Sequence, residues 1–477
     1  DSGGRPVCLE YTRTEEFTTA SPRHPMTITV KLGARADGTL TAVHFHNISN
    51  TGAYGNHGGE TLFAASAAVA IYRCPNKRFD AYAVYTNTVP SGALRGYGMT
   101  QPAFAVECAI DELAAALGID ALELRRRNIV RPGDALLATD AHPDDVSFTE
   151  DTLARCIDRV DRALREHREH SGGDDLGPDW LIGDGIASSI HETAPPTEHI
   201  SEAWATLCDD GRYEIAVGTV EFGEGTSTAH VQIAASVLFT TPDRIRLVQS
   251  DTDRTGFDTG AFASAGLFVA GNAVLRAATA LRDRMLLLAA DHTGVDRASC
   301  FLADDTVICG GKRIPVSELN AAAAARGMRL TEARKAYGSP RSVSANTQGM
   351  RVAVNRVTGE IRILYSVQAL DPGVVINPAQ VRGQVEGGVA QGIGFVLTEN
   401  FHLDDTGTML NPNLRNYRIP TYADIPRTEV LIVESTDSAG PMASKGIAES
   451  CINPVAPALA NAVYDATGIR FRDLPLT

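Results

Sequence analysis

The chain has 477 residues, of which 44% are hydrophobic and 21% charged, a composition typical of a packed globular protein rather than a disordered one. Its 58 acidic and 43 basic residues give a formal charge of −15, which repels polyanions, so nucleic-acid binding is not expected. No apolar run reaches the roughly 20 residues of a membrane helix and no leader pattern opens the sequence, so we expect a cytoplasmic protein without a membrane partner.

The N-terminal region predicts strands. Residues 7–11 are strand-like, and alternating apolar residues indicate further strands around 28–32 and 40–45. An Asp37-Gly38 step lies between the last two, and this dipeptide is common in hairpin turns. We therefore expect an antiparallel hairpin after a separate first strand.

Helices follow the hairpin. Apolar residues recur at helical spacing over 101–118, and a second helix is expected over 121–129. Ser147 and Glu150 stand at capping-box spacing before a third amphipathic pattern, and the polar segment 170–175 that follows is the expected domain boundary. The two predicted domains are residues 1–172 and 173–477.

The C-terminal region repeats one arrangement, in which a strand reaches a glycine-rich loop that opens a helix. Backbone N–H groups at such helix starts can cradle an anion, so the loops suit an extended, phosphate-bearing cofactor. Equally, glycines cap helices and form turns in most proteins, and neither a dinucleotide-binding nor a P-loop motif is present. The expected units are strand 213–220 with loop Glu221–Gly225, strand 245–248 with the loop ending at Gly266, and hairpin 350–367 with helix 381–396.

The eight cysteines are scattered, with no CxxC pair and no Cys/His group at zinc spacing. We therefore expect neither structural zinc nor an iron–sulphur cluster within this chain, and we assign no metal-ligating residue. Dispersed cysteines in so long a chain are typical of small buried apolar residues in a reducing compartment, although the sequence leaves a disulfide open.

Glu449 lies in a loop of small residues, Ser444–Ser450, before a C-terminal helix. One interpretation is an ordinary carboxylate near a helix start, where the helix dipole favours negative charge. The other is a carboxylate in a tight, dry pocket, which suits a general base. Local pattern alone favours the first interpretation.

The segment Ala93–Gly98 places Arg95 and Tyr97 two positions apart among glycines. In one interpretation Tyr97 stacks on a planar substrate while Arg95 offers a forked donor to a developing oxyanion. In the other, the segment is a turn with Arg95 in solvent. Arg23-His24-Pro25 is a further basic spot, which a surface turn before the next strand explains.

Six of these segments stand in the order found in the molybdenum hydroxylases, and the chain resembles the molybdopterin-binding subunit of the xanthine dehydrogenase family over nearly its whole length. The ordered set is far more specific than any single motif. The resemblance implies an α+β fold with two molybdopterin-binding domains of mixed sheets and helices, the first incomplete at its N-terminus. The segments are Arg23–Pro25, Leu94–Gly98, Glu221–Gly225, Ala263–Ala265, Gly383–Gly387 and Lys445–Glu449.

The resemblance also implies roles for individual residues. Glu449 matches the family's catalytic base, which deprotonates a molybdenum-bound hydroxyl so that its oxygen attacks an electron-poor carbon. Arg95 matches an arginine at the molybdenum pocket, and Tyr97 matches an aromatic residue that stacks on substrate. Segments that contact the pterin cofactor contain Phe222, Gly223, Ala263, Ser264, Ala265 and Gln384.

Three departures from the family pattern matter. Members carry a further glycine-rich, cofactor-contacting motif upstream of Arg5-Pro6-Val7, which is absent from this sequence, so we expect a separate chain to complete the molybdenum domain. Glu224 stands where a Gln is common, which puts its cofactor contact in question. Purine-oxidising members place an arginine in the stretch that reads Glu60–Phe63 here, which argues against a purine substrate.

The resemblance thus implies a subunit that binds molybdenum–molybdopterin in a dinucleotide form. It would insert water-derived oxygen into an aromatic N-heterocycle, nicotinate-like or purine-like. Electrons would leave through iron–sulphur clusters and FAD on partner chains, because this chain lacks the cysteine motifs for a cluster. The alternatives are oxidation of an aldehyde or other carbonyl at the same site, and a non-catalytic scaffold that binds partners through its glycine-rich loops.

Overall fold

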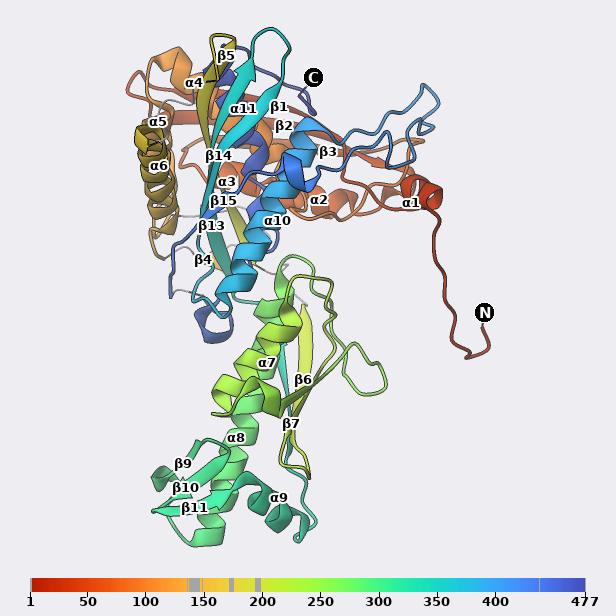
Figure 1. Ribbon diagram of the computed structural model, residues 1–477, viewed down its shortest axis with the longest axis vertical. Helices are drawn as coiled ribbons and strands as arrows, with labels where there is room; N and C mark the ends of the chain where they lie inside the picture. Colours follow the sequence, from red (N-terminus) through yellow and green to blue (C-terminus); the bar gives the residue numbers. More distant parts are fainter. Residues whose placement is uncertain are drawn as a thin grey trace.

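The computed structural model describes residues 2–134, 136, 146–147, 149–170, 176–193, 199–436 and 438–476. Helices and mixed sheets form two lobes stacked along the long axis of the molecule (Figure 1). The lobes are named here for their place in the sequence. The central lobe consists of residues 199–337, and the terminal lobe consists of the described residues before and after them. The expected α+β class is confirmed.

The terminal lobe begins with a three-stranded sheet of β1 (Met26–Ala34), β2 (Leu40–Gly52) and β3 (Lys77–Tyr85). β1 and β2 pair antiparallel, so the hairpin predicted at Asp37-Gly38 is confirmed. The helix predicted over 101–118 packs against β1 as α4. The helices of this region are α2 (Gly58–Ala65), α3 (Ala67–Ala70), α4 (Thr100–Leu117) and α5 (Ala121–Asn128).

The strand predicted at 7–11 is wrong. Val7 and Leu9 are 76% and 80% exposed, and the segment pairs with no described strand. A β-prone sequence forms a strand only where a neighbour takes its backbone hydrogen bonds and a core covers its side chains, and this segment has neither. It leads instead to the short helix α1 (Arg13–Thr19), which Thr12 caps.

The second sheet of the terminal lobe joins segments that are far apart in the sequence. Its order is β15-β14-β13-β4, and β5 pairs with β13. The third predicted helix, α6, packs on β13 and β14, while α11 packs on β5 and β13 (Figure 1). The elements are β4 (Val146–Ser147), α6 (Thr152–His170), β5 (Trp180–Thr193), β13 (Arg341–Asn355), β14 (Ile361–Leu370), α10 (Pro378–Leu397), β15 (Thr428–Ile432) and α11 (Val455–Thr467).

Helix α11 lies directly against the backbone of β5. A Cβ atom on Gly185 would lie 2.1 Å from the carbonyl oxygen of Ala458, and one on Gly183 would lie 2.3 Å from that of Ala462. Only glycine permits so close an approach. The contact fixes α11 against the sheet, and with it the loop that precedes α11.

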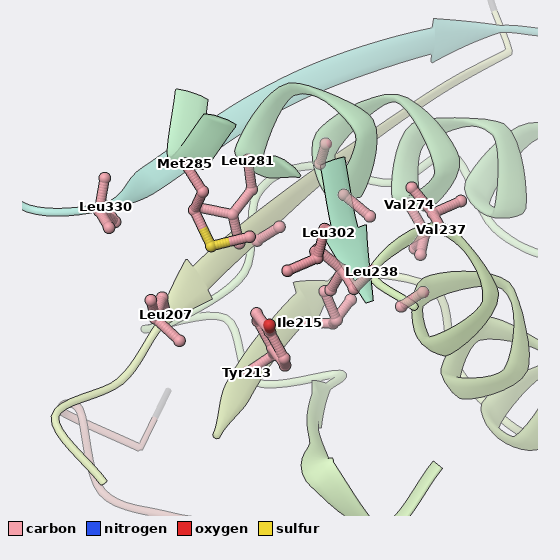
Figure 2. Close-up of a cluster of buried hydrophobic side chains, with 14 of the residues drawn as sticks. Leu207, Tyr213, Ile215, Val237, Leu238, Val274, Leu281, Met285, Leu302 and Leu330 are labelled. Carbon is pink, nitrogen blue, oxygen red and sulfur yellow. The ribbon is translucent and has the colours of Figure 1, made fainter. Parts of the chain in front are cut away.

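The central lobe contains the sheet β12-β6-β7-β8, covered by α7 and α8 (Figure 1). Figure 2 shows its core, where Leu207, Tyr213 and Ile215 of the sheet pack near Leu281 and Met285 of α8. Two predicted strand–loop–helix units are confirmed here, β7 with α7 and β8 with α8. The elements are β6 (Ile200–Leu207), β7 (Tyr213–Val217), α7 (Thr226–Val237), β8 (Ile245–Gln249), α8 (Gly271–Thr293), β9 (Cys300–Ala303), β10 (Thr306–Cys309), β11 (Lys312–Pro315), α9 (Val316–Ala324) and β12 (Thr331–Tyr337).

Two cysteines depart from the interpretation as isolated apolar residues. Cys300 and Cys309 face each other on the hairpin of β9 and β10 and form a disulfide. Their spacing along the chain does not reveal the hairpin register that brings them together. The other cysteines are free, and three of them are buried, namely Cys108, Cys156 and Cys451.

The predicted domain boundary falls within 171–175, outside the described residues, so the ranges 1–172 and 173–477 remain a prediction. On either side of it, α6 and β5 both pack on β13 in the terminal lobe. In the part of the chain that the structure describes, no helix combines the length and the apolar character needed to cross a bilayer.

Candidate functional site

A cavity of about 1140 Å³ lies where the two lobes meet. The terminal lobe contributes the segments 93–99, 372–384 and 444–449 to its wall, and the central lobe contributes 222–229 and 261–267. These segments contain most of the motifs that the sequence analysis singled out. The fold therefore brings residues from distant parts of the chain to one cavity.

The structure places nearly all of the predicted site residues on this wall. Ala265 is the exception, because it is fully buried in the core of the central lobe. The chain turns sharply just before it, where Ala263 and Ser264 have left-handed φ angles of 52° and 56°, and this turn directs the next side chain inward. The residues on the wall are Glu449, Arg95, Tyr97, Phe222, Gly223, Ala263, Ser264 and Gln384.

Glu449 ends the loop 444–449 and its side chain is only 13% exposed. Oε1 accepts a hydrogen bond from the backbone N–H of Tyr97 at 3.3 Å, and the backbone N–H of Glu449 donates to Ser264 Oγ at 3.3 Å. Oε2 is buried and makes no hydrogen bond with any described residue. A nearly buried carboxylate with an unsatisfied oxygen fits a proton acceptor better than an ordinary charge at a helix start.

The loop 444–449 is held tightly in place. A Cβ atom on Gly446 would lie 2.3 Å from the carbonyl oxygen of Ser264, so the loop and the turn at 263–264 touch through their backbones. The Nζ of Lys445 donates to Asp371 Oδ2 at 2.7 Å, in a pair whose side chains are 1% and 0% exposed. The position of Glu449 therefore depends on both lobes.

Arg95 joins two parts of the cavity wall. Its Nε donates to the carbonyl oxygen of Ala448 at 2.5 Å. Its Nη2 donates to the carbonyl oxygen of Gln384 on α10 at 2.8 Å and to the side-chain Oε1 of Gln384 at 3.1 Å. The interpretation as a turn with Arg95 in solvent is therefore wrong. Because Oε1 of Gln384 faces Arg95, the amide NH₂ of Gln384 is the group left to donate to a ligand.

We expect Arg95→Lys to weaken this junction. An ammonium group lacks the planar fork that serves both wall segments at once, so at least one acceptor loses its charged donor. The free energy of unfolding should fall by about 2 kcal/mol, measured by denaturant titration. Arg382→Lys is the matched control. Arg382 lies on α10, the helix that carries Gln384, and forms an exposed pair with Glu386, so this variant should change stability by less than about 0.5 kcal/mol. Equal losses in the two variants would contradict a special role for Arg95.

Tyr97 is fixed at both ends. Its hydroxyl donates to the carbonyl oxygen of His57 at 3.2 Å and lies 3.1 Å from His57 Nδ1, and the two rings meet edge-on. Burial raises the pKa of Tyr97 to about 12, so the phenol is neutral near pH 7. The backbone of Tyr97 therefore holds Glu449 while its ring forms part of the wall.

The surface turn predicted at Arg23-His24-Pro25 is wrong. Arg23 Nη2 donates to the carbonyl oxygen of Arg95 at 2.7 Å, and its guanidinium lies 5.5 Å from the ring centroid of Phe395. Burial lowers the pKa of Arg23 to about 10, against the opposing effect of the charges of Glu449 and Glu399. Arg23 therefore stabilises the backbone of the Arg95 segment.

The first glycine-rich loop does not present an empty anion cradle. The N–H groups of Gly223 and Gly225 donate to Glu221 Oε1 at 2.8 and 2.9 Å, and the N–H of Ser227 donates to Glu221 Oε2 at 2.9 Å. Glu224 accepts from a further backbone N–H of the loop. The expectation that these groups await a cofactor phosphate is wrong for this loop, because carboxylates of the chain already take them.

The acid sensitivity of this loop follows from the same contacts. Burial disfavours the charged form of Glu221, but hydrogen bonds from three backbone N–H groups outweigh it and lower the pKa to about 2. The stability that Glu221 contributes is therefore complete above its ordinary pKa of 4.5 and is lost as the pH falls through about 2. We expect Glu221→Gln to lower Tm at pH 7, with a difference from wild type that shrinks at pH 4 and pH 3. A difference that grows toward acid would contradict this assignment.

His191 on β5 is a site residue that the sequence analysis missed. It is 7% exposed and lines the cavity, and its Nε2 lies 3.5 Å from Glu449 Oε2 and 3.4 Å from Ser264 Oγ. A single histidine within a strand pattern gives no chemical signal of its own. Its partners come from two loops far along the chain, which no local pattern connects.

Comparison with known proteins identifies the family. Two models described as "Molybdopterin cofactor-binding domain" match the chain, one over residues 2–129 and the other over residues 156–426. The second match alone covers more than half of the chain. The chain belongs to the molybdenum hydroxylase family.

Individual members of the molybdenum hydroxylase family match almost all of this chain. It is 35% identical over 485 residues to "Probable hypoxanthine oxidase XdhD" of Escherichia coli strain K12, covering 99% of this chain and 50% of that protein. It is 31% identical over 487 residues to "Xanthine dehydrogenase molybdenum-binding subunit" of Escherichia coli O157:H7, covering 100% of this chain and 64% of that protein. The crystal structure of quinoline 2-oxidoreductase from Pseudomonas putida 86 superposes with a TM-score of 0.87 at 26% identity, covering 96% of this chain and 61% of that one. The chain thus spans between half and two thirds of the length of these proteins.

The cavity has features that fit the molybdopterin group of the molybdenum hydroxylases. Its volume of about 1140 Å³ is slightly larger than that of ordinary small-molecule sites, which measure roughly 300–1,000 Å³. Gly223 has a φ of 106° and nothing within 4 Å of its Cβ position, so a ligand can approach the backbone there. The carboxylate of Glu449 and the side-chain amide of Gln384, both on the cavity wall, supply an acceptor and a donor. Within the described part of the chain, no group of three His, Cys, Asp or Glu side chains is placed to hold a metal ion.

Proposed function

We propose that the chain forms the molybdenum site of a hydroxylase that oxidises an aromatic N-heterocycle with water-derived oxygen. The observation that carries the proposal is the convergence of Glu449, Gln384 and both central-lobe loops on one cavity. Proteins similar to the chain are named for hypoxanthine and quinoline, which are both N-heterocycles. The proposed cofactor is molybdenum–molybdopterin in a dinucleotide form, contacted by Phe222, Gly223, the turn at 263–264 and Gln384.

The bound cofactor supplies a two-electron oxidation with oxygen transfer. The chain's own part is to hold a proton acceptor on the cavity wall. Glu449 is that acceptor because its carboxylate is nearly buried and accepts the Tyr97 N–H, while Ser264 binds its backbone N–H. Arg95, predicted to be catalytic, acts as a positioning residue, since its donors already serve Ala448 and Gln384. Gln384 is the amide donor for the cofactor.

The substrate wall favours a neutral heterocycle. Glu60 and Phe63 on α2 line the cavity with Tyr97, so this wall combines aromatic rings with a negative charge. No arginine lies in the Glu60–Phe63 stretch to attract an anion. An anionic substrate such as nicotinate would be repelled, whereas a neutral ring could stack.

The proposal includes partner chains. Iron–sulphur clusters and FAD on other chains would take the electrons from molybdenum, with the assembly in the cytoplasm. Supporting this, a relative that is 31% identical is named as one subunit, the molybdenum-binding one.

The test is to purify the intact assembly through a tag on this chain from its own cells. Metal analysis and mass spectrometry should find molybdenum, a pterin dinucleotide and co-purifying chains with iron–sulphur clusters and FAD. A panel of quinoline, hypoxanthine, nicotinate and benzaldehyde in ¹⁸O-labelled water should give the highest kcat/KM and labelled product with a neutral heterocycle. Preference for benzaldehyde would replace the proposal with carbonyl oxidation, and an assembly without molybdenum and pterin would reduce the chain to a scaffold.

A further inference from the structure

The buried oxygen of the proposed base faces an imidazole. His191 Nε2 lies 3.5 Å from Glu449 Oε2, and the two side chains are 9% and 13% exposed. A buried carboxylate oxygen without a donor is costly, so the geometry favours a proton on Nε2. The opposite tautomer would set a nitrogen lone pair against the oxygen lone pairs.

Three segments of the chain hold His191 and Glu449 in place. His191 lies on β5 directly opposite Ser344 of β13 and is 7% exposed. Ser264 Oγ lies 3.4 Å from His191 Nε2 and accepts the backbone N–H of Glu449 at 3.3 Å. The hydroxyl reaches both partners because Ser264 has a left-handed φ of 56°, a strained conformation that persists only where the surroundings impose it.

We propose that His191 is a positioning residue for Glu449. The Nε2–H of His191, 3.5 Å from Oε2, attracts that oxygen electrostatically, so that Oε1 receives the proton released during turnover. This inference rests on the proposed function, because it gives the proposed base a defined orientation. The proton forms a bond with Oε1 and leaves a neutral carboxylic acid, while the imidazole keeps its own proton throughout. Without His191 the carboxyl group could rotate, and its two oxygens would become interchangeable.

The charged side chains near His191 each have an identified interaction partner. Glu449 faces it from the loop 444–449, and Lys445 of the same loop pairs with Asp371. Glu192, the next residue on β5, pairs with Arg341 of β13. Burial lowers the pKa of His191, and the charge of Glu449 raises it in part, so the ring is neutral at pH 7 and becomes a cation in acid.

The first experiment measures the pair in the apoprotein and needs no turnover. NMR of the full chain with ¹⁵N-labelled histidine, with His191 assigned through His191→Gln, reports the tautomer and the pKa. We expect a protonated Nε2 and a pKa for His191 that falls by about 0.5 or more in Glu449→Gln, because the carboxylate charge that raises it is gone. A bare Nε2, or a pKa that does not respond to Glu449→Gln, would overturn the proposal.

The second experiment uses the loaded assembly and separates positioning from packing. His191→Leu should lower kcat by about tenfold to a hundredfold with little change in KM, and His191→Gln, which keeps an N–H donor, should restore much of the loss. His230→Gln is the matched control, because His230 is also buried but its Nε2 lies 3.2 Å from the carbonyl oxygen of Gly266. It should leave the pH profile of kcat unchanged, whereas His191→Leu should remove an acidic ionisation from it. Equal activity in His191→Gln and His191→Leu would overturn the positioning role.

The two hypotheses fail differently. If Glu449→Gln keeps full turnover, the proposed function of Glu449 falls, while the apoprotein NMR still decides whether the pair exists. If Glu449→Gln is inactive but the NMR shows no coupling, the base stands and the His191 inference falls.

Discussion

Glu449→Gln is expected to lower kcat by about 100-fold to 10,000-fold, the range typical of losing a positioned general base. The amide has nearly the same shape and can still accept the Tyr97 N–H through its oxygen, so the loop should keep its fold. It cannot take up a proton near neutral pH, and its NH₂ group would face either the buried position of Oε2 or the cavity. The measurement is kcat per bound molybdenum in the purified assembly.

Glu386→Gln is the control for this substitution. Glu386 forms an exposed pair with Arg382 on α10, and its side chain is 42% exposed, so its amide variant should keep wild-type kcat and molybdenum content. Loss of molybdenum in Glu449→Gln would assign the residue to cofactor retention, and unchanged turnover would remove it from the chemistry.

Local sequence pattern was enough to predict the elements whose apolar residues recur at a regular spacing. Alternation found β1 and β2, helical spacing found α4 and α5, and glycine-rich loops correctly marked the starts of α7 and α8. The strand expected at 7–11 failed because strand formation depends on a partner that the local sequence does not reveal. The Cys300–Cys309 bridge was missed for a similar reason, since it depends on the register of β9 and β10.

The site was predictable as a set of segments but not as a set of contacts. Motif order singled out Glu449, Arg95 and Gln384, and all of them line one cavity. Local sequence could not show that Arg23 supports Arg95 or that His191 faces Glu449, because both contacts are between distant segments. Three-dimensional placement, rather than residue type, makes these side chains relevant to the chemistry.

The Glu221 contacts give a second example of this limit. A glycine-rich loop before a helix has backbone N–H groups that suit an anion, and the sequence analysis assigned them to a cofactor. The structure shows that the anion is the carboxylate of Glu221 itself. Whether such a loop binds a ligand or a side chain depends on the loop conformation, which composition does not define.

The largest effect on stability is expected for Lys445→Met. Lys445 and Asp371 form an ion pair with side chains that are 1% and 0% exposed, and removing the cation leaves a carboxylate buried without its charged partner. Breaking such a pair from one side costs about 3–5 kcal/mol, although replacing both partners often costs little. Methionine has a similar length and fills the same space, so the loss should reflect charge rather than packing. Denaturant titration of the apoprotein measures the free energy of unfolding.

Two comparisons make the Lys445→Met result interpretable. The double variant Asp371→Asn/Lys445→Met removes the buried charge but keeps an acceptor for the Ser435 hydroxyl and the Gly373 N–H, so it should recover a large part of the loss. Lys335→Met tests a surface pair, since Lys335 is 51% exposed and 3.9 Å from Glu202, and it should change stability by less than about 1 kcal/mol. Because Lys445 lies in the same loop as Glu449, the single variant should also lower kcat at temperatures where it remains folded. A variant as stable as wild type would show that the pair does not anchor the loop that carries the proposed base.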